Sequence, residues 1–524
     1  MWQTAVGCEP ATLASSESRL YVACFDSGNL IVMDEKTGKV LKRRWVGNGP
    51  FGLVAVSNVL YVTLSHDNSL VALKKDSLEE ITRAQTGSEP RGIALWGDEI
   101  FVVHVSDASV AAYDAHTLKK RGEAVIGQNA ATAESIAISA ARTRAYVPHQ
   151  RMNVTNITRT FDSTVFPLVS ALDMQYLSPV RREALALDSV DRPVSMPIAV
   201  ALSKDEQVLY TANAASDDIS IIDLNSGIGT GNIPVGQHPR DIAISPDGAL
   251  LYTLNLVSDD ITVIETQKKA VVNTLTLATD NRPDEIKRGE RIFFSSRPDE
   301  ISRDNWMACA SCHLDGGSDG NVWLGSDGGP RNTTTLRGVH GTEPLHWSAD
   351  RPDIQSFQLT FKTLMEGKGL SYADLDALAA YINSLPPIQS PLRKPDGSLK
   401  PEAIKGAKVF QKAGCAECHT LPLFTDRKLH DVGTGQTYYK LPTGTDIPET
   451  MGTSFDTPSL RELWLTAPYL HDGRAPTLSD VMTTLNQGNQ HGNTSGLTEQ
   501  DMSELETFLL SLPLSDDEQK TLFK

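Results

Sequence analysis

The chain has 524 residues, which at about 150 residues per domain predicts three or four structural units. Its 48 Lys and Arg residues against 65 Asp and Glu residues give a net charge of −17, which argues against a nucleic acid or an anionic membrane surface as partner. Hydrophobic residues make up 40% of the chain, which excludes disorder as its main state. No apolar run approaches the 18 or so residues that span a bilayer, so no transmembrane segment is expected.

A glycine-containing turn recurs every 40 residues in the first half of the chain. Gly7, Gly47, Gly87 and Gly127 open similar segments, and a further copy follows 109 residues later, which fits two more repeats and an insertion. Each repeat contains β-branched and aromatic runs such as RLYVACFD and LIVMD. About 40 residues with four short strands are typical of a β-propeller blade. Residues 1–280 are therefore predicted to form an all-β propeller of six or seven blades.

The phrase VGQHPRDIAISPDGALLYTLNLVSDDITVIET resembles the YVTN-type propeller family, and the similarity extends over about residues 1–277. The plain interpretation of this half is a scaffold without chemistry of its own. The insertion at about residues 150–193 fits a surface flap, and it fits slightly better a lid or docking surface for the second half. Cys8 and Cys24 lie on neighbouring predicted strands and fit a disulfide as well as two buried free thiols.

After residue 285 the hydrophobic period changes from 2 to 3.6, and one helical pattern occurs twice. Each copy has an amphipathic helix, a C-x-x-C-H motif and a 17-residue helix with Ser or Thr at its N-cap. The matching segments are 286–296 and 404–414, CASCH (309–313) and CAECH (415–419), and 370–386 and 497–513. We therefore predict two all-α cytochrome c-type domains at 281–388 and 404–524, joined by a Pro-rich linker at 389–403.

C-x-x-C-H is the attachment motif of c-type haem. Two thiols one helical turn apart bind the two vinyl groups of one porphyrin, and the adjacent His ligates the iron. A zinc site would need a second pair of ligands near each motif, and a thioredoxin-like pair would need a βαβ context. The motifs predict two covalent haem c groups, attached through Cys309 and Cys312 with His313 as iron ligand, and through Cys415 and Cys418 with His419 as iron ligand.

The second half resembles the bacterial di-haem cytochrome c peroxidase superfamily, which includes the enzyme that matures methylamine dehydrogenase and, more remotely, a rubber oxygenase. The matching phrases are CASCH, GPRN, LHWSADR, CAECH, FTDRKLHDVG and TPSLRELWLTAPYLHDGRAPTLSDV, and they cover about residues 286–513. The resemblance implies reduction of hydrogen peroxide, or peroxide-driven oxidation of a substrate, at haem 1. Haem 2 would then relay electrons from a small redox protein.

The resemblance also assigns roles to two residues near haem 1. Peroxidases of this type have a Trp between the haems, sixteen residues after the Arg of GPRN, and Trp347 lies sixteen residues after Arg331. An indole that only packs the domain seam is the alternative. Glu366, in TLMEG, lies at about the distance after Trp347 where a distal carboxylate would move a proton between the peroxide oxygens. Its alternative is an exposed glutamate at a helix end.

The sixth ligand of haem 1 stays open, because the family's distal His position, seven residues before Arg331, is occupied by Leu324. A leucine cannot bind iron. Haem 1 is therefore either five-coordinate and open, or it takes a different ligand, with His346 and His340 as the nearest candidates in the sequence.

For haem 2 the family's Met or Tyr position, fourteen residues after His471, is Leu485. His491 is the favoured ligand, because imidazole is a strong ligand for low-spin haem, and Met482 is the second candidate. The loop DGGSDGN (315–321) has oxygen ligands at close spacing, and the family often holds calcium between its domains. A plain surface loop is the alternative to a calcium site there.

We therefore expect a periplasmic, extracellular or cell-surface di-haem c-type oxidoreductase with an N-terminal propeller. The segment Met1–Gly7 has no basic or apolar region of a signal peptide, so an export signal is expected to be absent from this sequence. A haem-dependent oxygenase and a non-catalytic electron carrier are the alternatives. An open five-coordinate haem 1 favours an enzyme, whereas two six-coordinate haems favour the carrier.

Overall fold

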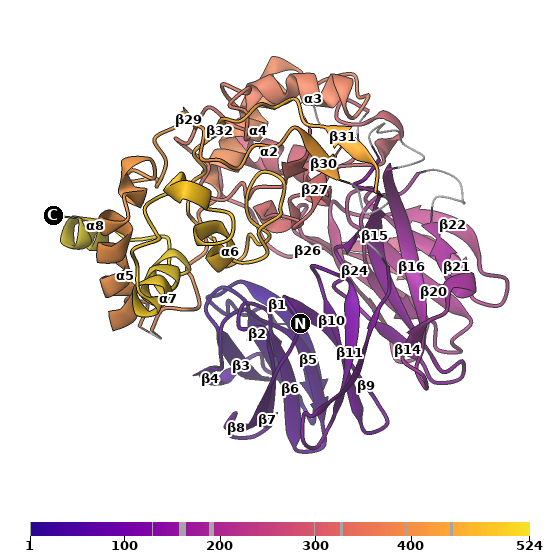
Figure 1. Cartoon of the computed structure of the whole chain (residues 1–524). Coiled ribbons are helices and arrows are strands. Elements are labelled where there is room, and N and C mark those ends of the chain that lie inside the picture. Colours follow the sequence, from indigo (N-terminus) through magenta and orange to yellow (C-terminus); the bar gives the residue numbers. More distant parts are fainter. Residues whose placement is uncertain are drawn as a thin grey trace. The chain divides into compact units, whose positions relative to one another are not determined.

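The computed structural model describes residues 2–127, 129–156, 164–187, 193–297, 299–324, 329–394, 396–440 and 444–523. The chain divides into two units (Figure 1). The first comprises Met1–Met152 and Val165–Asp280, and the second comprises Asn153–Thr164 and Asn281–Lys524. In the described part of the chain, no helix is long and apolar enough to cross a membrane.

The first unit is a six-bladed propeller in which each blade is an antiparallel sheet. The first strands of neighbouring blades contact each other, whereas the last strands are largely exposed. Five blades have four strands: β1 (Pro10–Ser16), β2 (Arg19–Cys24), β3 (Asn29–Asp34) and β4 (Val40–Trp45); β5 (Pro50–Val56), β6 (Val59–Leu64), β7 (Ser69–Lys74) and β8 (Glu80–Gln85); β9 (Pro90–Trp96), β10 (Glu99–His104), β11 (Ser109–Asp114) and β12 (Lys120–Val125); β19 (Pro197–Leu202), β20 (Val208–Asn213), β21 (Asp218–Asp223) and β22 (Ile228–Pro234); and β23 (Pro239–Ile244), β24 (Leu250–Asn255), β25 (Asp260–Glu265) and β26 (Ala270–Thr276).

The fourth blade shows what the insertion does. It contains β13 (Ala130–Ala131), β14 (Ala137–Ser139), β15 (Arg144–Met152), β16 (Val165–Asp173), β17 (Ser178–Pro179) and β18 (Leu185–Ala186). The long strands β15 and β16 pair along their whole length, so much of the predicted insertion at 150–193 belongs to the sheet instead of a flap. Only Asn153–Thr164 leaves the propeller and groups with the second unit. Residues 157–163 and 188–192 of the insertion lie outside the described residues.

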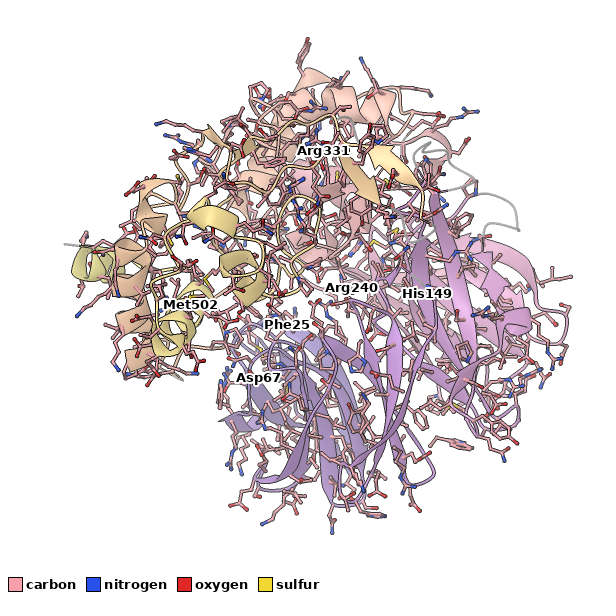
Figure 2. The ribbon with its side chains drawn as sticks, viewed as in Figure 1. Phe25, Asp67, His149, Arg240, Arg331 and Met502 are labelled. Carbon is pink, nitrogen blue, oxygen red and sulfur yellow. A yellow bond between two sulfur atoms is a disulfide. The ribbon has the colours of Figure 1, made fainter. Side chains whose placement is uncertain are left out.

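Two interactions join different parts of the propeller. Cys8 and Cys24 form a disulfide, which decides between the two states that the sequence left open. The buried carboxylate of Glu134 forms ion pairs with Arg91 on β9 and with Arg240 on β23, the latter at 2.9 Å. Glu134 therefore connects three blades, and Figure 2 labels Arg240 at its place on the inner strand.

The second unit is helical, with short strands between the helices. Its α-helices are α2 (Asp284–Phe294), α3 (Gln358–Thr363), α4 (Tyr372–Ser384), α5 (Pro401–Lys412), α6 (Leu478–Met482), α7 (Glu499–Leu509) and α8 (Asp516–Leu522). Its strands are β27 (Val322–Trp323), β28 (Arg331–Asn332), β29 (Leu429–His430), β30 (Tyr438–Lys440), β31 (Asp446–Pro448) and β32 (Phe455–Asp456). As predicted, Ser371 and Thr498 cap the two matching helices, since each side chain accepts a hydrogen bond from the amide three residues later.

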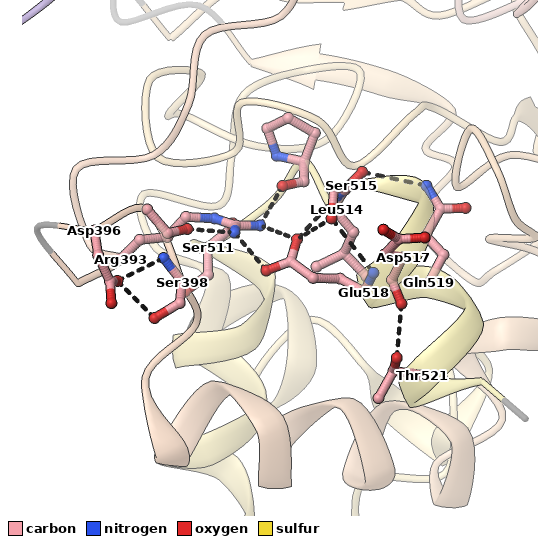
Figure 3. A network of polar contacts seen from close by, with 12 residues as sticks. Arg393, Asp396, Ser398, Ser511, Leu514, Ser515, Asp517, Glu518, Gln519 and Thr521 are labelled. Atoms are coloured by element: carbon pink, nitrogen blue, oxygen red, sulfur yellow. Dashed lines mark hydrogen bonds and ion pairs between the residues drawn. The ribbon is translucent and has the colours of Figure 1, made fainter.

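Arg393 anchors the segment between the two helical copies (Figure 3). Its guanidinium is buried, donates to the carbonyl oxygen of Ser511 at 2.9 Å and pairs with Glu518 at 2.8 Å. Because a buried charge is stable only when paired and hydrogen-bonded, this linker is held firmly against the C-terminal residues.

Each helical copy is built on a close contact between its first and last long helix. Gly289 of α2 faces the backbone of α4, where an added Cβ atom would lie 1.9 Å from the carbonyl oxygen of Ala377. Gly406 of α5 faces α7 in the same way, and its Cβ would lie 1.9 Å from the carbonyl oxygen of Glu504. No side chain fits at such a distance, so both positions require glycine.

We expect Gly406→Ala to lower the free energy of unfolding of the second helical copy by about 3 kcal/mol, because the added methyl group forces α5 and α7 apart. The midpoint of urea unfolding, followed by circular dichroism, measures the effect. Gly496→Ala is the matched control, since nothing lies within 4 Å of a Cβ at that loop position. A Gly406→Ala midpoint equal to that of the control would contradict the close contact.

Candidate functional site

The two C-x-x-C-H motifs form identical short turns. The first lies on the 3-10 turn Cys309–Ser311 and the second on Cys415–Glu417. In both, the amide of the histidine donates to the carbonyl oxygen of the first cysteine at 3.0 Å. Burial raises the pKa of Cys309 to about 12 and that of Cys415 to about 11. These are not the low-pKa thiols of a reactive redox pair.

The histidines of both motifs have the environment of an iron ligand. His313 Nδ1 donates to the carbonyl oxygen of Gly317 at 3.0 Å, and His419 Nδ1 donates to that of Phe424 at 3.1 Å. These bonds fix each ring and leave Nε2 as the free electron pair. Burial lowers the pKa of His313 and lowers that of His419 to about 4, so both rings are neutral near pH 7, as ligation requires.

One largely apolar cavity of about 550 Å³ runs through the helical unit. Both C-x-x-C-H motifs contribute to its wall, which suits a hydrophobic porphyrin with few polar contacts. Arg337 and Arg461 line it from matching phrases, TLR and SLR, and offer cationic groups for haem propionates. The cavity is also lined by Arg331, Asn332, His346, Trp347, His430, Asp456, His471, Met482 and His491.

His491 lies across the cavity from His419. Their ring centroids are 6.4 Å apart and their planes differ by 35°. Two metal–nitrogen bonds of about 2 Å, with roughly 1 Å from each ring centre to its nitrogen, require about 6 Å between centroids. The gap therefore fits one iron atom between two imidazoles. Met482 also borders the cavity, and it packs in the hydrophobic core of the second copy.

The surroundings of the first C-x-x-C-H motif differ from those of the second. Leu324 is buried outside the cavity wall, and its amide donates to the carbonyl oxygen of Val154 at 2.9 Å. His346 lines the cavity, and its Nδ1 bonds Asp350 at 2.9 Å. Burial, with Arg331 nearby, lowers the pKa of His346 to about 4. Of the two alternative ligands, the structure thus brings His346 to the cavity and leaves His340 exposed.

Trp347 lies at the seam between the two helical copies. Its Nε1 donates to the carbonyl oxygen of Asn332 at 3.0 Å, and its ring lies edge-on to His471 with centroids 6.3 Å apart. His471 belongs to the second copy, pairs with the buried Glu449 at 2.6 Å and stacks on Phe455. The indole is therefore in contact with both copies.

Glu366 does not reach the cavity. It is exposed, with 42% of its side chain accessible, and pairs with Arg303 at 3.0 Å. Its backbone has a φ of 53°, which turns the chain at the end of the helix away from the wall. The structure thus gives Glu366 the surface position that was its alternative, and no role in proton transfer is assigned to it.

The predicted calcium loop uses its oxygens locally. Asp319 accepts from the amide of Asn321 and from the indole of Trp323 at 3.2 Å. Among the described residues, no group of three or more His, Cys, Asp or Glu side chains has the arrangement of a metal site. Calcium stays a prediction that this geometry does not support.

Sequence reasoning missed the pairing of the two copies across the seam. An offset of 124 residues relates TLR to SLR, Trp347 to His471 and Asn332 to Asp456. The structure repeats this relation, because an isolated bridge joins Leu345 and Arg351 in one copy, and another joins Tyr469 and Ala475 in the other. The TLR and SLR phrases were the signal that could have located Asn332 and Asp456.

Comparisons with known proteins match this architecture. A family model described as "Lactonase, 7-bladed beta-propeller" matches residues 181–281, which include the last two blades. The hydrazine synthase subunit gamma of Kuenenia stuttgartiensis is 32% identical over 257 residues, 39% of this chain and 72% of that protein. The methylamine utilization protein MauG of Methylorubrum extorquens is 28% identical over 248 residues, 38% and 68%. The cytochrome-c peroxidase IdrP2 of Denitromonas iodatirespirans is 26% identical over 296 residues, 43% and 79%.

If His419 and His491 bind one haem iron, His491→Ala should convert that haem from low-spin to high-spin, because it removes the imidazole opposite His419. Electron paramagnetic resonance of the ferric protein measures the change. Met482→Leu is the control, since it keeps the packing volume and should leave the spectrum as in wild type. An unchanged low-spin signal in His491→Ala would rule out ligation by His491.

Proposed function

We propose that this protein is a di-haem enzyme that acts on hydrogen peroxide. The chain belongs to the family of the hydrazine synthase gamma subunit, the MauG proteins and the cytochrome c peroxidases. Its relatives identify it as a haem oxidoreductase of the peroxidase type that binds c-type haem. The shared cavity is the observation that supports a di-haem enzyme, because its wall contains both C-x-x-C-H turns and Trp347 at the seam between the two copies.

Cys309 and Cys312 would hold haem 1, with His313 as its iron ligand, and Cys415 and Cys418 would hold haem 2, with His419 and His491 as its iron ligands. Bound haem supplies a redox-active iron that exchanges single electrons. The chain's own groups set the difference between the two centres. Two imidazoles face each other in the second domain, whereas the first domain has no such facing pair of imidazoles among its described residues.

His346 is the group that we assign to proton transfer at haem 1. Reduction of peroxide to two waters consumes two protons, so a group that exchanges protons must face the cavity. His346 lines it, and its bond to Asp350 orients the ring. If His346 instead bound the iron, haem 1 would be six-coordinate and low-spin, so the spin state separates these two roles.

We also propose a cell compartment and an electron donor for this protein. The Cys8–Cys24 disulfide and covalent haem attachment both favour a periplasmic or extracellular site. The electron donor would be a small redox protein, and a net charge of −17 favours a basic one. The sequence similarity to a hydrazine synthase subunit favours a second candidate function, in which this chain is one subunit of a larger redox enzyme.

We expect the ferric protein to show one high-spin and one low-spin haem, because among the described residues only the second domain offers a facing imidazole pair. Hydrogen peroxide should remove the high-spin signal without prior reduction, as rapid-freeze electron paramagnetic resonance can show. Two low-spin signals, with no binding of cyanide, would instead support the electron carrier. Uptake of O₂ into a substrate without peroxide would support the oxygenase.

We expect Trp347→Phe to keep both haems and peroxide binding but to slow electron exchange between the haems about tenfold or more, because the relay indole is lost. Stopped-flow absorption after mixing with peroxide measures the lag of haem 2 oxidation. Trp45→Phe is the control, since that indole is exposed on β4 of the propeller. If Trp347 only packs the seam, the variant loses stability by a few kcal/mol with unchanged exchange.

A further inference from the structure

The two copies hold each other by a reciprocal pair of backbone hydrogen bonds. The amide of Asn332, on β28, donates to the carbonyl oxygen of His471 at 2.7 Å. The amide of Asp456, on β32, donates to the carbonyl oxygen of Trp347 at 2.8 Å. Each strand therefore supports the turn of the other copy, and Asn332 and Asp456 occupy equivalent positions.

From the first copy to the second, the side chain of Asn332 adds to this support. The amide nitrogen Nδ2 of the buried Asn332 donates to the carbonyl oxygens of Pro468 and Leu470, at 2.5 and 3.1 Å. A neutral side chain with a donor thus fixes the turn that carries His471. By the offset of 124 residues, the carbonyl oxygens of Pro344 and His346 correspond to these acceptors on the turn that carries Trp347.

From the second copy to the first, the equivalent side chain is the carboxyl group of Asp456, which can donate a hydrogen bond only when it is protonated. The Oδ1 atom of Asp456 is buried and finds no hydrogen-bond partner among the described residues. A buried polar oxygen without a partner is costly, and protonation would turn it into the donor that Asn332 provides.

We propose that Asp456 is a positioning residue for Trp347: its protonated carboxyl donates to a backbone carbonyl of the Trp347 turn, and loss of the proton releases that turn. The proposal rests on the function proposed above, in which Trp347 relays electrons between the haems. Asp456 lines the cavity, and the proton that it releases passes to water.

The charged surroundings favour the neutral form. Burial, and then the nearby Asp426 carboxylate, raise the pKa of Asp456 to about 7, against a smaller opposing effect of the Thr457 amide. Asp426 is itself bonded to His430 at 2.8 Å. On the Trp347 turn, the titratable groups His346 and Asp350 bond each other. Next to β32, His471 is paired with Glu449.

The test compares electron exchange between the haems in the wild-type holoprotein and in Asp456→Asn, across about pH 5 to pH 9. The wild-type rate should fall about fivefold as pH rises through neutrality, the effect of one ordinary hydrogen bond. Asp456→Asn should keep the low-pH rate throughout, because its amide donates at every pH. A variant with the wild-type pH profile would overturn the proposal.

Asp426→Asn provides an independent variant. It removes the like charge that raises the pKa of Asp456, so the midpoint of the wild-type rate change should move to lower pH. A midpoint that stays in place would contradict the assignment of the titration to Asp456.

A second measurement separates this proposal from the relay function. The infrared difference spectrum between wild type and Asp456→Asn should contain a protonated-carboxyl band that disappears as pH rises through neutrality. Absence of the band at low pH would overturn the role of Asp456, whatever Trp347 does. If Trp347→Phe leaves electron exchange unchanged while the band titrates, the relay function fails and the hydrogen bond of Asp456 stands.

Discussion

The contact between a glycine of the first helix and the backbone of the last helix determines the shape of each haem-binding half. Gly289 and Gly406 bring two helices to a separation that no side chain permits. The C-x-x-C-H turns and several short strands lie between these helices in the chain and line one largely apolar cavity. The thiols and imidazoles of both motifs therefore face a space whose apolar wall suits a porphyrin.

The two helical halves are alike in construction and differ in a few side chains at equivalent positions. Trp347 and His471 occupy equivalent turns and contact each other across the seam, yet one is an oxidisable indole and the other an imidazole paired with a carboxylate. Asn332 and Asp456 differ in the same way, by one titratable group. Because the frames match, these few differences can give the two halves separate roles in an electron path.

Much of this organisation could be predicted from the sequence, because it rests on local patterns. The propeller repeats, the C-x-x-C-H motifs and the helix caps at Ser371 and Thr498 depend on residues that are close along the chain. The expected position of Glu366 near haem 1 came from counting residues past Trp347. Glu366 itself has a left-handed backbone conformation, and such a turn of the chain cannot be found by counting. The facing rings of His419 and His491, like the environment of Asp456, depend on residues far apart in sequence, and only the folded chain brings them together.

The order of the two units along the chain limits how they can be separated. The first unit comprises Met1–Met152 and Val165–Asp280, and the second comprises Asn153–Thr164 and Asn281–Lys524. Each unit is therefore built from two separate stretches of the chain. A truncation after residue 280 would keep Asn153–Thr164 in the propeller fragment, although this stretch groups with the second unit, so no single cut yields either unit whole.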